Sequence, residues 1–290
     1  MKKNRTNSCR TSIIKTLSYS GVFGYPITFY QISNNLISGS FTYKKIRKEL
    51  EKLVDEGAVK KIKNRFMLKG IKTHDVSKRE KYTREIIEKY KEKIKLLKKV
   101  PWVKMIAVTG SVANYDAKEG DDIDLLIVTE KNRLWITRGF VFLILKIINE
   151  LPKDKSKRNI CPNIFLDENN MAWSKKKRNL YVAQNIISMQ PFSWRDDTYF
   201  KFINENDWIR KYYKNFNLNY QGRKTKIKKD SPLMALLEKI ARKKEMEYMK
   251  KDITTEVVNP KLIHFNKNDS TKKILSKYKE ILKKYQNSQK

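Results

Sequence analysis

Apolar residues recur at helical spacing in three segments near the start of the chain, namely 12–17, 29–36 and 43–54. A hairpin is predicted after them, because two short extended runs, 58–63 and 65–68, meet at Asn64. Three helices followed by a hairpin is the element order of a winged helix. Residues 1–75 are therefore expected to form a winged-helix domain.

The middle of the chain combines helical and extended patterns. Its predicted elements are a long charged helix, two apolar strands, a helix and a third strand, at 77–99, 103–108, 122–128, 134–149 and 160–166. The unbroken apolar end of the second strand indicates that both of its faces are buried. Residues 76–190 are expected to form a mixed-sheet core with a leading linker helix.

The pattern after Trp173 is helical. Apolar residues recur at helical spacing in 180–189, 200–203, 208–213, 232–250 and 271–286. Residues 191–290 are therefore expected to form a helical C-terminal domain. The predicted fold class is α+β, with a winged helix, a mixed-sheet core and a helical end.

A glycine-serine pair and an acidic run lie on successive strands of the predicted core. Gly110 and Ser111 follow the first strand. Asp122 and Asp124 open the next one. Residues i and i+2 of a strand share a face, so these two carboxylates are expected to converge while Asp121 points away. Two carboxylates that close repel each other unless a cation lies between them.

Such a carboxylate pair suits Mg²⁺, which prefers one or two carboxylates together with water and substrate phosphates. Gly110 allows the backbone to approach a phosphate, and Ser111 offers a hydroxyl and backbone N–H groups at the head of a helical turn. The four residues are expected to hold a nucleoside triphosphate on a metal ion for in-line attack at its α-phosphate. An acidic turn before a core strand is the alternative interpretation.

These motifs resemble the nucleotidyltransferase superfamily, which includes DNA polymerase β, the CCA-adding enzymes and the aminoglycoside nucleotidyltransferases. Gly110 with Ser111 matches the glycine-serine pair of that family, and Asp122 with Asp124 matches its aspartate pair. The wider sequence is similar to prokaryotic nucleotidyltransferase-domain proteins that begin with a winged helix, through TLSYSGVFGYPIT, AVTGSVAN, DDIDLLIVTEKNRLWITR and NICPNIFLDE. The resemblance implies a Mg²⁺-dependent transferase that uses an NTP, with ATP expected. Its acceptor would be a hydroxyl of RNA, protein or a small molecule.

Fully active members of that family usually carry a third carboxylate on the neighbouring strand, where this chain has Asn163. An asparagine can ligate a metal weakly but cannot take a proton at neutral pH. The general base would then be Asp167, Glu168 or water. The alternative function is that of a non-catalytic, nucleic-acid-binding regulator with a degenerate nucleotidyltransferase core.

Two arginines, Arg133 and Arg138, lie at the start of the helix that follows the acidic strand. One of them could reach a phosphate of the bound nucleotide. The alternative is that they are surface arginines whose stems pack on Trp135.

Positive charge is concentrated in the two flanks of the chain. The net charge is +34, of which the first hundred residues carry +17, the next hundred +3 and the last ninety +14. Basic flanks favour a nucleic-acid partner, whereas a general lysine bias would require none. A protein-docking winged helix with solvated lysines is the other alternative. The basic residues of the third predicted helix that could meet phosphates are Lys44, Lys45, Arg47 and Lys48.

Some classes of site and location are excluded or disfavoured. Two cysteines, Cys9 and Cys161, and two histidines are too few for a disulfide framework or a Cys/His metal site. The longest apolar run, 140–145, is far below the ~20 residues that a membrane span needs. The start of the chain lacks the apolar stretch of a signal peptide. The sequence therefore predicts a cytoplasmic protein with no membrane partner.

Overall fold

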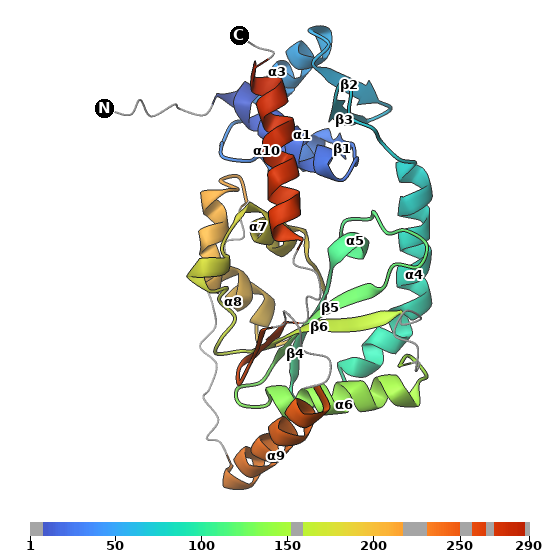
Figure 1. Cartoon of the computed structure of the whole chain (residues 1–290), viewed down its shortest axis with the longest axis vertical. Coiled ribbons are helices and arrows are strands. Elements are labelled where there is room, and N and C mark those ends of the chain that lie inside the picture. Colours follow the sequence, from blue (N-terminus) through green and yellow to red (C-terminus); the bar gives the residue numbers. More distant parts are fainter. Residues whose placement is uncertain (1–7, 152–158, 217–230, 250–256, 265–269, 288–290) are drawn as a thin grey trace, which may run out of the picture.

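A computed structural model describes residues 8–151, 159–216, 231–249, 257–264 and 270–287 of the chain. Figure 1 shows a small unit of helices and a hairpin at one end and a larger unit around a sheet at the other. The long helix α4 (Val76–Leu97) leads from the first unit to the second, and α10 (Thr271–Asn287) returns to the first.

The N-terminal unit consists of helices and a small antiparallel sheet. Its helices are α1 (Cys9–Val22), α2 (Phe29–Asn34) and α3 (Tyr43–Asp55). Its strands are β1 (Ile27–Thr28), β2 (Val59–Ile62) and β3 (Arg65–Leu68), in the order β1-β3-β2. The helices and the hairpin follow one another as the sequence predicts, while the assignment of this unit as a winged helix remains a prediction.

Local signals explain the boundaries of these elements. The Thr28 hydroxyl accepts a hydrogen bond from the backbone N–H of Gln31, whose side chain accepts one from the Thr28 N–H. This capping box starts α2. A stripe of Ile46, Leu50 and Leu53 buries one face of α3 in the core of the unit. The helix α1 is longer than the predicted 12–17 because Ser8 caps it and because it buries polar as well as apolar side chains.

Within the described residues, the second unit is built on a mixed six-stranded sheet in the order β7-β4-β5-β6-β9-β8. β5 and β6 are parallel, and the other neighbouring pairs are antiparallel. The strands are β4 (Val103–Thr109), β5 (Ile123–Thr129), β6 (Ile160–Asp167), β7 (Gln190–Trp194), β8 (Val257–Asn259) and β9 (Leu262–His264).

Helices cover both faces of the sheet. One face packs against α4, α6 (Leu134–Ile147) and α9 (Pro232–Met249). The other face packs against α7 (Leu180–Ser188), α8 (Thr198–Glu205), the 3₁₀ helix η3 (Asp207–Lys211) and α10. Leu125 and Ile127 enter the first core, whereas Leu126 and Val128 enter the second. β5 is thus buried on both faces, as its unbroken apolar run predicts. Two short elements complete the description, α5 (Gly110–Ala113) and η2 (Lys175–Lys177).

The helices predicted after Trp173 leave out three strands, β7, β8 and β9, which belong to the central sheet, so residues 191–290 are not purely helical. β7 contains Pro191, and β8 and β9 are three residues long each. Such short edge strands are defined by the strands they pair with rather than by a period of their own. The residues assigned to a helical C-terminal domain therefore extend the core sheet at both edges.

The helix α10 joins the two units. Ile281 and Leu282 pack against the cores of both units. The ring of Tyr278 lies edge-on to that of Tyr19 with centroids 5.9 Å apart. The Lys277 ammonium donates a hydrogen bond to the Val22 carbonyl over 2.9 Å. None of the helices in the described ranges is long and apolar enough to cross a membrane.

Candidate functional site

The turn from β4 into α5 lies beside the beginning of β5. β4 and β5 are antiparallel, and Thr109 at the end of β4 pairs with Asp124. The residue after Thr109 is therefore held against the Asp124 carboxylate. This register brings the glycine-serine pair and the acidic run together at one end of these two central strands.

Gly110 has a backbone conformation and surroundings that suit only glycine. Its φ is +70°, in the left-handed region. A Cβ atom at this position would lie 2.5 Å from Oδ2 of Asp124. The backbone consequently turns directly over the carboxylate, with no side chain between them.

Asp122 and Asp124 line one open cavity of about 350 Å³ together with Ser111, Gly120 and Asp121. Asp124 lies in β5, and Asp122 lies immediately before it. Both aspartates are half-buried. The structure therefore brings the predicted carboxylate pair and the predicted serine to the same opening, where their roles remain predictions.

The expectation that Asp121 points away is wrong. β5 begins at Ile123, so the alternation of strand side chains does not extend to Asp121. The Asp121 carboxylate accepts hydrogen bonds from the Ser111 hydroxyl and from the Lys118 backbone N–H, both at 2.9 Å. Asp121 thus fixes the loop between β4 and β5 and orients Ser111.

The environment of Asp124 disfavours its charged form. Burial raises the pKa of Asp124, and the neighbouring charges of Asp122 and Asp121 raise it further. The Asn163 amide donates a hydrogen bond to Oδ1, which lowers the pKa, but the net result is a pKa of about 7. A divalent cation between the carboxylates would reverse this effect, because an opposite charge favours the ionised form.

Asn163 lies where the sequence places it, next to Asp124. Asp124 pairs with Cys161, and the β5–β6 register then shifts by one residue at Asn163. The amide of this bulged residue donates to Asp124, and its carbonyl oxygen lies 2.9 Å from the Cys161 sulfur. Bulges commonly redirect a side chain next to a functional site.

Asp167 and Glu168 are too far away to act as the general base, which corrects that expectation. Asp167 pairs with Thr129, five residues beyond Asp124 along parallel strands, so it lies roughly 16 Å away. The Asp167 carboxylate accepts hydrogen bonds from the backbone N–H groups of Asn132 and Asn169. Glu168 accepts one from Lys131. Both acids stabilise loops at the opposite end of the strands.

Arg133 and Arg138 are also remote from the carboxylate pair. Both belong to the start of α6, beyond the far end of β5, and both are buried. Arg138 forms an ion pair with Glu245 of α9, and its guanidinium lies 4.3 Å from the centre of the Phe142 ring. The helices α6 and α9 are held together by this contact, and neither arginine reaches the acidic cavity.

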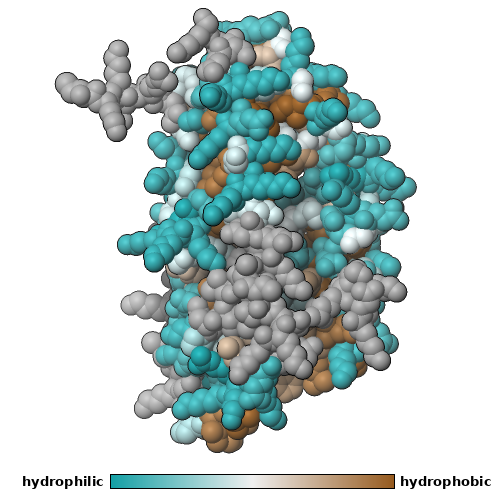
Figure 2. Space-filling model, viewed as in Figure 1, coloured by the Kyte–Doolittle hydropathy of each residue, from teal (hydrophilic) through white to brown (hydrophobic). Residues whose placement is uncertain are grey.

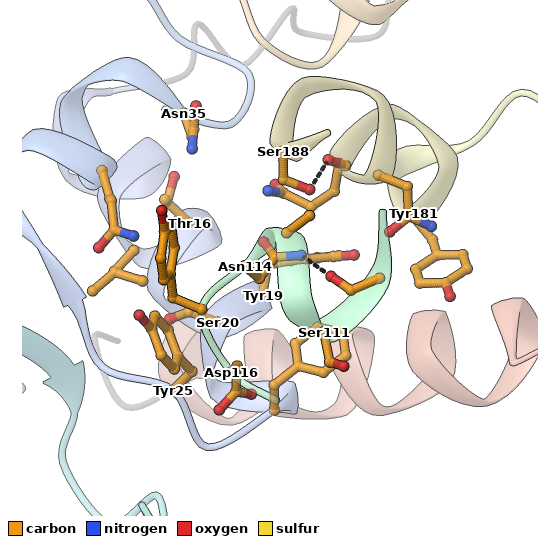
Figure 3. A pocket seen from close by; sticks show the side chains of 18 of the residues that line it. Thr16, Tyr19, Ser20, Tyr25, Asn35, Ser111, Asn114, Asp116, Tyr181 and Ser188 are labelled. Atoms are coloured by element: carbon orange, nitrogen blue, oxygen red, sulfur yellow. Dashed lines mark hydrogen bonds between the residues drawn. The ribbon is translucent and has the colours of Figure 1, made fainter. Parts of the chain in front are cut away.

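A second cavity, of about 440 Å³, lies between the N-terminal unit and the core. Ser111 lines both this cavity and the acidic one. Figure 3 shows Tyr19 and Tyr25 on one side, Tyr181 and Ser188 on the other, and Ser111 and Asn114 between them. Its walls come from segments far apart in the sequence, so no local motif indicates it.

The basic residues of α3 are exposed. Lys44, Lys45, Arg47 and Lys48 all lie on the outer side of the helix. The guanidinium of Arg47 lies 4.2 Å from the centre of the Phe29 ring, and the Lys45 ammonium lies 5.0 Å from that of Phe41. Hydrophilic side chains dominate this end of the molecule in Figure 2. The positions are accessible to a polyanion, and their partner remains a prediction.

Among the described residues, no group of three or more His, Cys, Asp or Glu side chains gathers to hold a metal ion. A cation at the acidic cavity would therefore depend on two carboxylates plus ligands from outside the chain. This is the coordination that Mg²⁺ uses when it binds with a phosphate substrate.

Comparison with known proteins identifies one domain. The family model described as nucleotidyltransferase domain matches residues 84–284. The match begins within α4 and ends within α10, so it includes the core walls of both cavities and leaves α1 to β3 outside. No curated protein and no solved structure matches the chain.

Proposed function

Because the chain belongs to the nucleotidyltransferase domain family, we propose that it transfers a nucleoside monophosphate from an NTP to an acceptor hydroxyl. The bond between the α-phosphorus and its bridging oxygen breaks, a bond from the acceptor oxygen forms, and pyrophosphate leaves. ATP is the proposed donor. The acceptor is RNA, protein or a small molecule, and a transfer assay with all three decides which.

The observation that carries this proposal is the approach of the Gly110 backbone to the Asp124 carboxylate. A left-handed glycine whose Cβ position lies 2.5 Å from Asp124 lets the turn pack directly against this carboxylate, and the open cavity of about 350 Å³ beside it can admit a phosphate. Ser111, the next residue, lines the same cavity, and its hydroxyl donates to Asp121. These features fit an NTP whose α-phosphate lies at the carboxylates and whose remaining phosphates extend along the turn.

The donor set fits Mg²⁺, with Asp122 and Asp124 as its protein ligands. When bound, Mg²⁺ would neutralise charge on the phosphates and orient the α-phosphate for in-line attack. Asp121 holds Ser111 in place, and Asn163 restrains the Asp124 carboxylate through its amide. Burial, and then the charges of Asp122 and Asp121, raise the pKa of Asp124, and a cation bound between the acids would offset their repulsion.

The acceptor proton requires a base other than Asn163, which cannot take it. Asp167 and Glu168 are held at the far end of the strands. We assign the proton to water in the acidic cavity. Attack by a hydroxyl without a positioned carboxylate base would be slower than in enzymes that have one, by about 10²–10⁴-fold.

The test is transfer of label from each α-labelled NTP in Mg²⁺ to RNA, to the protein itself and to small hydroxyl compounds. Label in a product, lost in Asp122→Ala and Asp124→Ala but retained in Glu168→Ala, is the expected result. Glu168→Ala is the matched control because it removes a carboxylate at the other end of β6. The proposal fails if no NTP gives transfer, or if all three variants transfer equally.

A second candidate function is that of a nucleic-acid-binding regulator with an inactive core. It is favoured by Asn163 in the third-acid position and by the exposed basic face of α3. In this case the N-terminal unit acts as a winged helix on DNA or structured RNA. Binding of nucleic acid without label transfer by the same preparation would select it.

A further inference from the structure

The cavity between the two units differs in chemistry from the rest of this strongly basic protein. Of the described residues that line it, none is a lysine or an arginine. Its lining combines aromatic rings, amides and hydroxyls, the amides being Gln31, Asn35, Asn114, Gln184, Asn185 and Gln190. The chain as a whole carries a net charge of +34. An anionic group enclosed in this cavity would therefore find no cationic side chain among these described residues.

The one carboxylate in the described lining is already paired. Arg79 of α4 donates to Oδ1 of Asp116 over 2.8 Å, and Nε2 of His74 lies 2.6 Å from the same oxygen. Asp116 is thus held by charge from outside the cavity. A polycationic ligand, such as an amino sugar, would find no free anion among these described side chains.

Two tyrosines of the lining, Tyr19 and Tyr25, are buried in a way that disfavours their charged forms. Burial raises the pKa of Tyr19, and burial likewise raises the pKa of Tyr25. The ring of Tyr19 contacts those of Phe23 and Tyr278, with centroids 5.7 and 5.9 Å away. Of these rings, Tyr19 and Phe23 line the cavity and form an apolar wall against which a flat molecule can lie.

Two amides in the cavity are available for recognition. Within the described part of the chain, the side chains of Asn35 and Asn185 make no hydrogen bond, whereas Gln184 accepts one from the Tyr213 hydroxyl. Asn35 comes from the end of α2 and Asn185 from α7, so they line the cavity from different walls. An amide that both donates and accepts matches the edge of a nucleobase, as Asn and Gln match adenine.

We propose that this cavity binds an uncharged nucleoside, a nucleobase with its sugar. Its volume of about 440 Å³ lies within the range usual for small-molecule sites. Aromatic walls supply stacking, and Asn35 and Asn185 read the edge of the base. The nucleoside belongs either to the donor NTP, whose phosphates pass Ser111, or to a separate molecule. The proposal does not depend on catalysis, because binding is measured without turnover.

The experiment is calorimetric titration of the full chain with adenosine, guanosine, cytidine and uridine, each without phosphate or metal. Saturable binding of at least one nucleoside is expected, with no binding of ribose alone. Asn35→Leu and Asn185→Leu should each weaken that binding at least about tenfold, the effect of losing one buried hydrogen bond of roughly 1.4 kcal/mol. Unfolding midpoints identify any variant that is not folded. If one leucine variant fails to fold, the variant of the other asparagine provides the test.

Two controls separate this proposal from the catalytic one. Asn169→Ala removes an exposed amide beyond β6, and Asp122→Ala removes a carboxylate of the acidic cavity. Both should bind the nucleoside as the parent chain does. We expect Asp122→Ala to lose Mg·NTP binding and to keep nucleoside binding. Loss of transfer activity in every preparation would remove the proposed function and leave the cavity assignment standing.

A competition step identifies the source of the nucleoside. If the NTP with the same base displaces the nucleoside, the cavity holds the donor's own base and sugar. If the two bind together, it holds a second molecule. Failure of all the nucleosides to bind, or equal binding in both leucine variants and the parent, overturns the proposal.

Discussion

Asp124 and Asp167 lie at opposite ends of the paired strands β5 and β6, and their surroundings differ. Asp167 is almost completely buried, and two backbone N–H groups donate to it. Asp124 is half-buried beside two other acids, and its pKa is raised to about 7 by burial and then by their charges. The carboxylate of Asp167 has its hydrogen-bond donors within the chain. The charged form of Asp124, by contrast, is unfavourable until a cation binds beside it. The comparison separates a structural acid from a candidate ligand.

The largest effect is expected on Mg²⁺-dependent NTP binding. Asp122→Ala or Asp124→Ala should abolish it, since each removes one of the two proposed protein ligands. Asp121→Ala should weaken it only in part, because it releases Ser111 without removing a ligand. Metal-dependent nucleotide titrations measure all three. Equal losses would mean that Asp121 is a ligand too and that the assignment of the pair is wrong.

Loss of the Asp167 carboxylate should lower the stability of the fold rather than NTP binding. Asp167→Ala leaves the N–H groups of Asn132 and Asn169 without their acceptors, which should lower the free energy of unfolding by about 3 kcal/mol. Urea unfolding measures this difference. Glu168→Ala is the control, and less than about 1 kcal/mol is expected because this side chain is only partly buried. A neutral Asp167→Ala would contradict a structural role.

The pH dependence should distinguish Asp124 further. Its folded pKa of about 7 lies above the ordinary aspartate value of 3.8, so the folded state holds the proton more tightly and stability falls as pH rises between these values. Without divalent cations, Asp124→Asn should be more stable than the parent by about 2 kcal/mol above pH 7, a value reduced for partial exposure. Below about pH 4 the advantage should disappear. An advantage that is independent of pH would show that the carboxylate does not titrate there.

Asn163→Asp tests the comparison further, because it adds a fourth carboxylate beside Asp121, Asp122 and Asp124. In Mg²⁺, turnover should be preserved or raised, because the new carboxylate can serve as ligand or base. Without Mg²⁺ the variant should be less stable, since an acid replaces the amide that donates to Asp124. Label transfer in Mg²⁺ measures the turnover. Unfolding with and without Mg²⁺ measures the stability. A folded, wholly inactive variant would assign Asn163 another role.

The smallest effect concerns the basic face of α3. Replacing Lys44, Lys45, Arg47 and Lys48 by glutamate in the full chain should flatten the salt dependence of nucleic-acid binding. On duplex DNA the log–log slope should fall by about 0.9 for each phosphate that the variant no longer neutralises. Filter binding across salt concentrations measures the slope. An unchanged slope would leave the N-terminal unit without a nucleic-acid role.

The sequence predicts what depends on local chemistry. The cap at Thr28 and the stripe from Ile46 to Leu53 specify their helices without reference to the rest of the chain. The glycine-serine turn and the acidic run also identify adjacent strands, because β4 and β5 are close in sequence and pair directly.

Features that depend on distant partners could not be predicted in this way. β9 is a strand because it pairs with β6, nearly a hundred residues earlier. Arg138 is buried because Glu245 of α9 meets it, and a helical pattern does not show that pairing. Asp121 lines the acidic cavity because strand alternation stops at Ile123. The cavity between the two units likewise requires three segments to meet before any of its residues is informative.

The return of α10 to the N-terminal unit has a consequence for how the protein is made. Ile281, Leu282 and Tyr285 pack against the core that α1 and α3 begin, and the Tyr285 hydroxyl donates to the Lys69 carbonyl. On the ribosome, the first unit emerges long before the helix that covers it. At roughly 5–20 residues per second, the intervening chain takes on the order of 10–40 s to synthesise. During that interval the earliest part of the protein has an uncovered apolar surface, on which a chaperone could act.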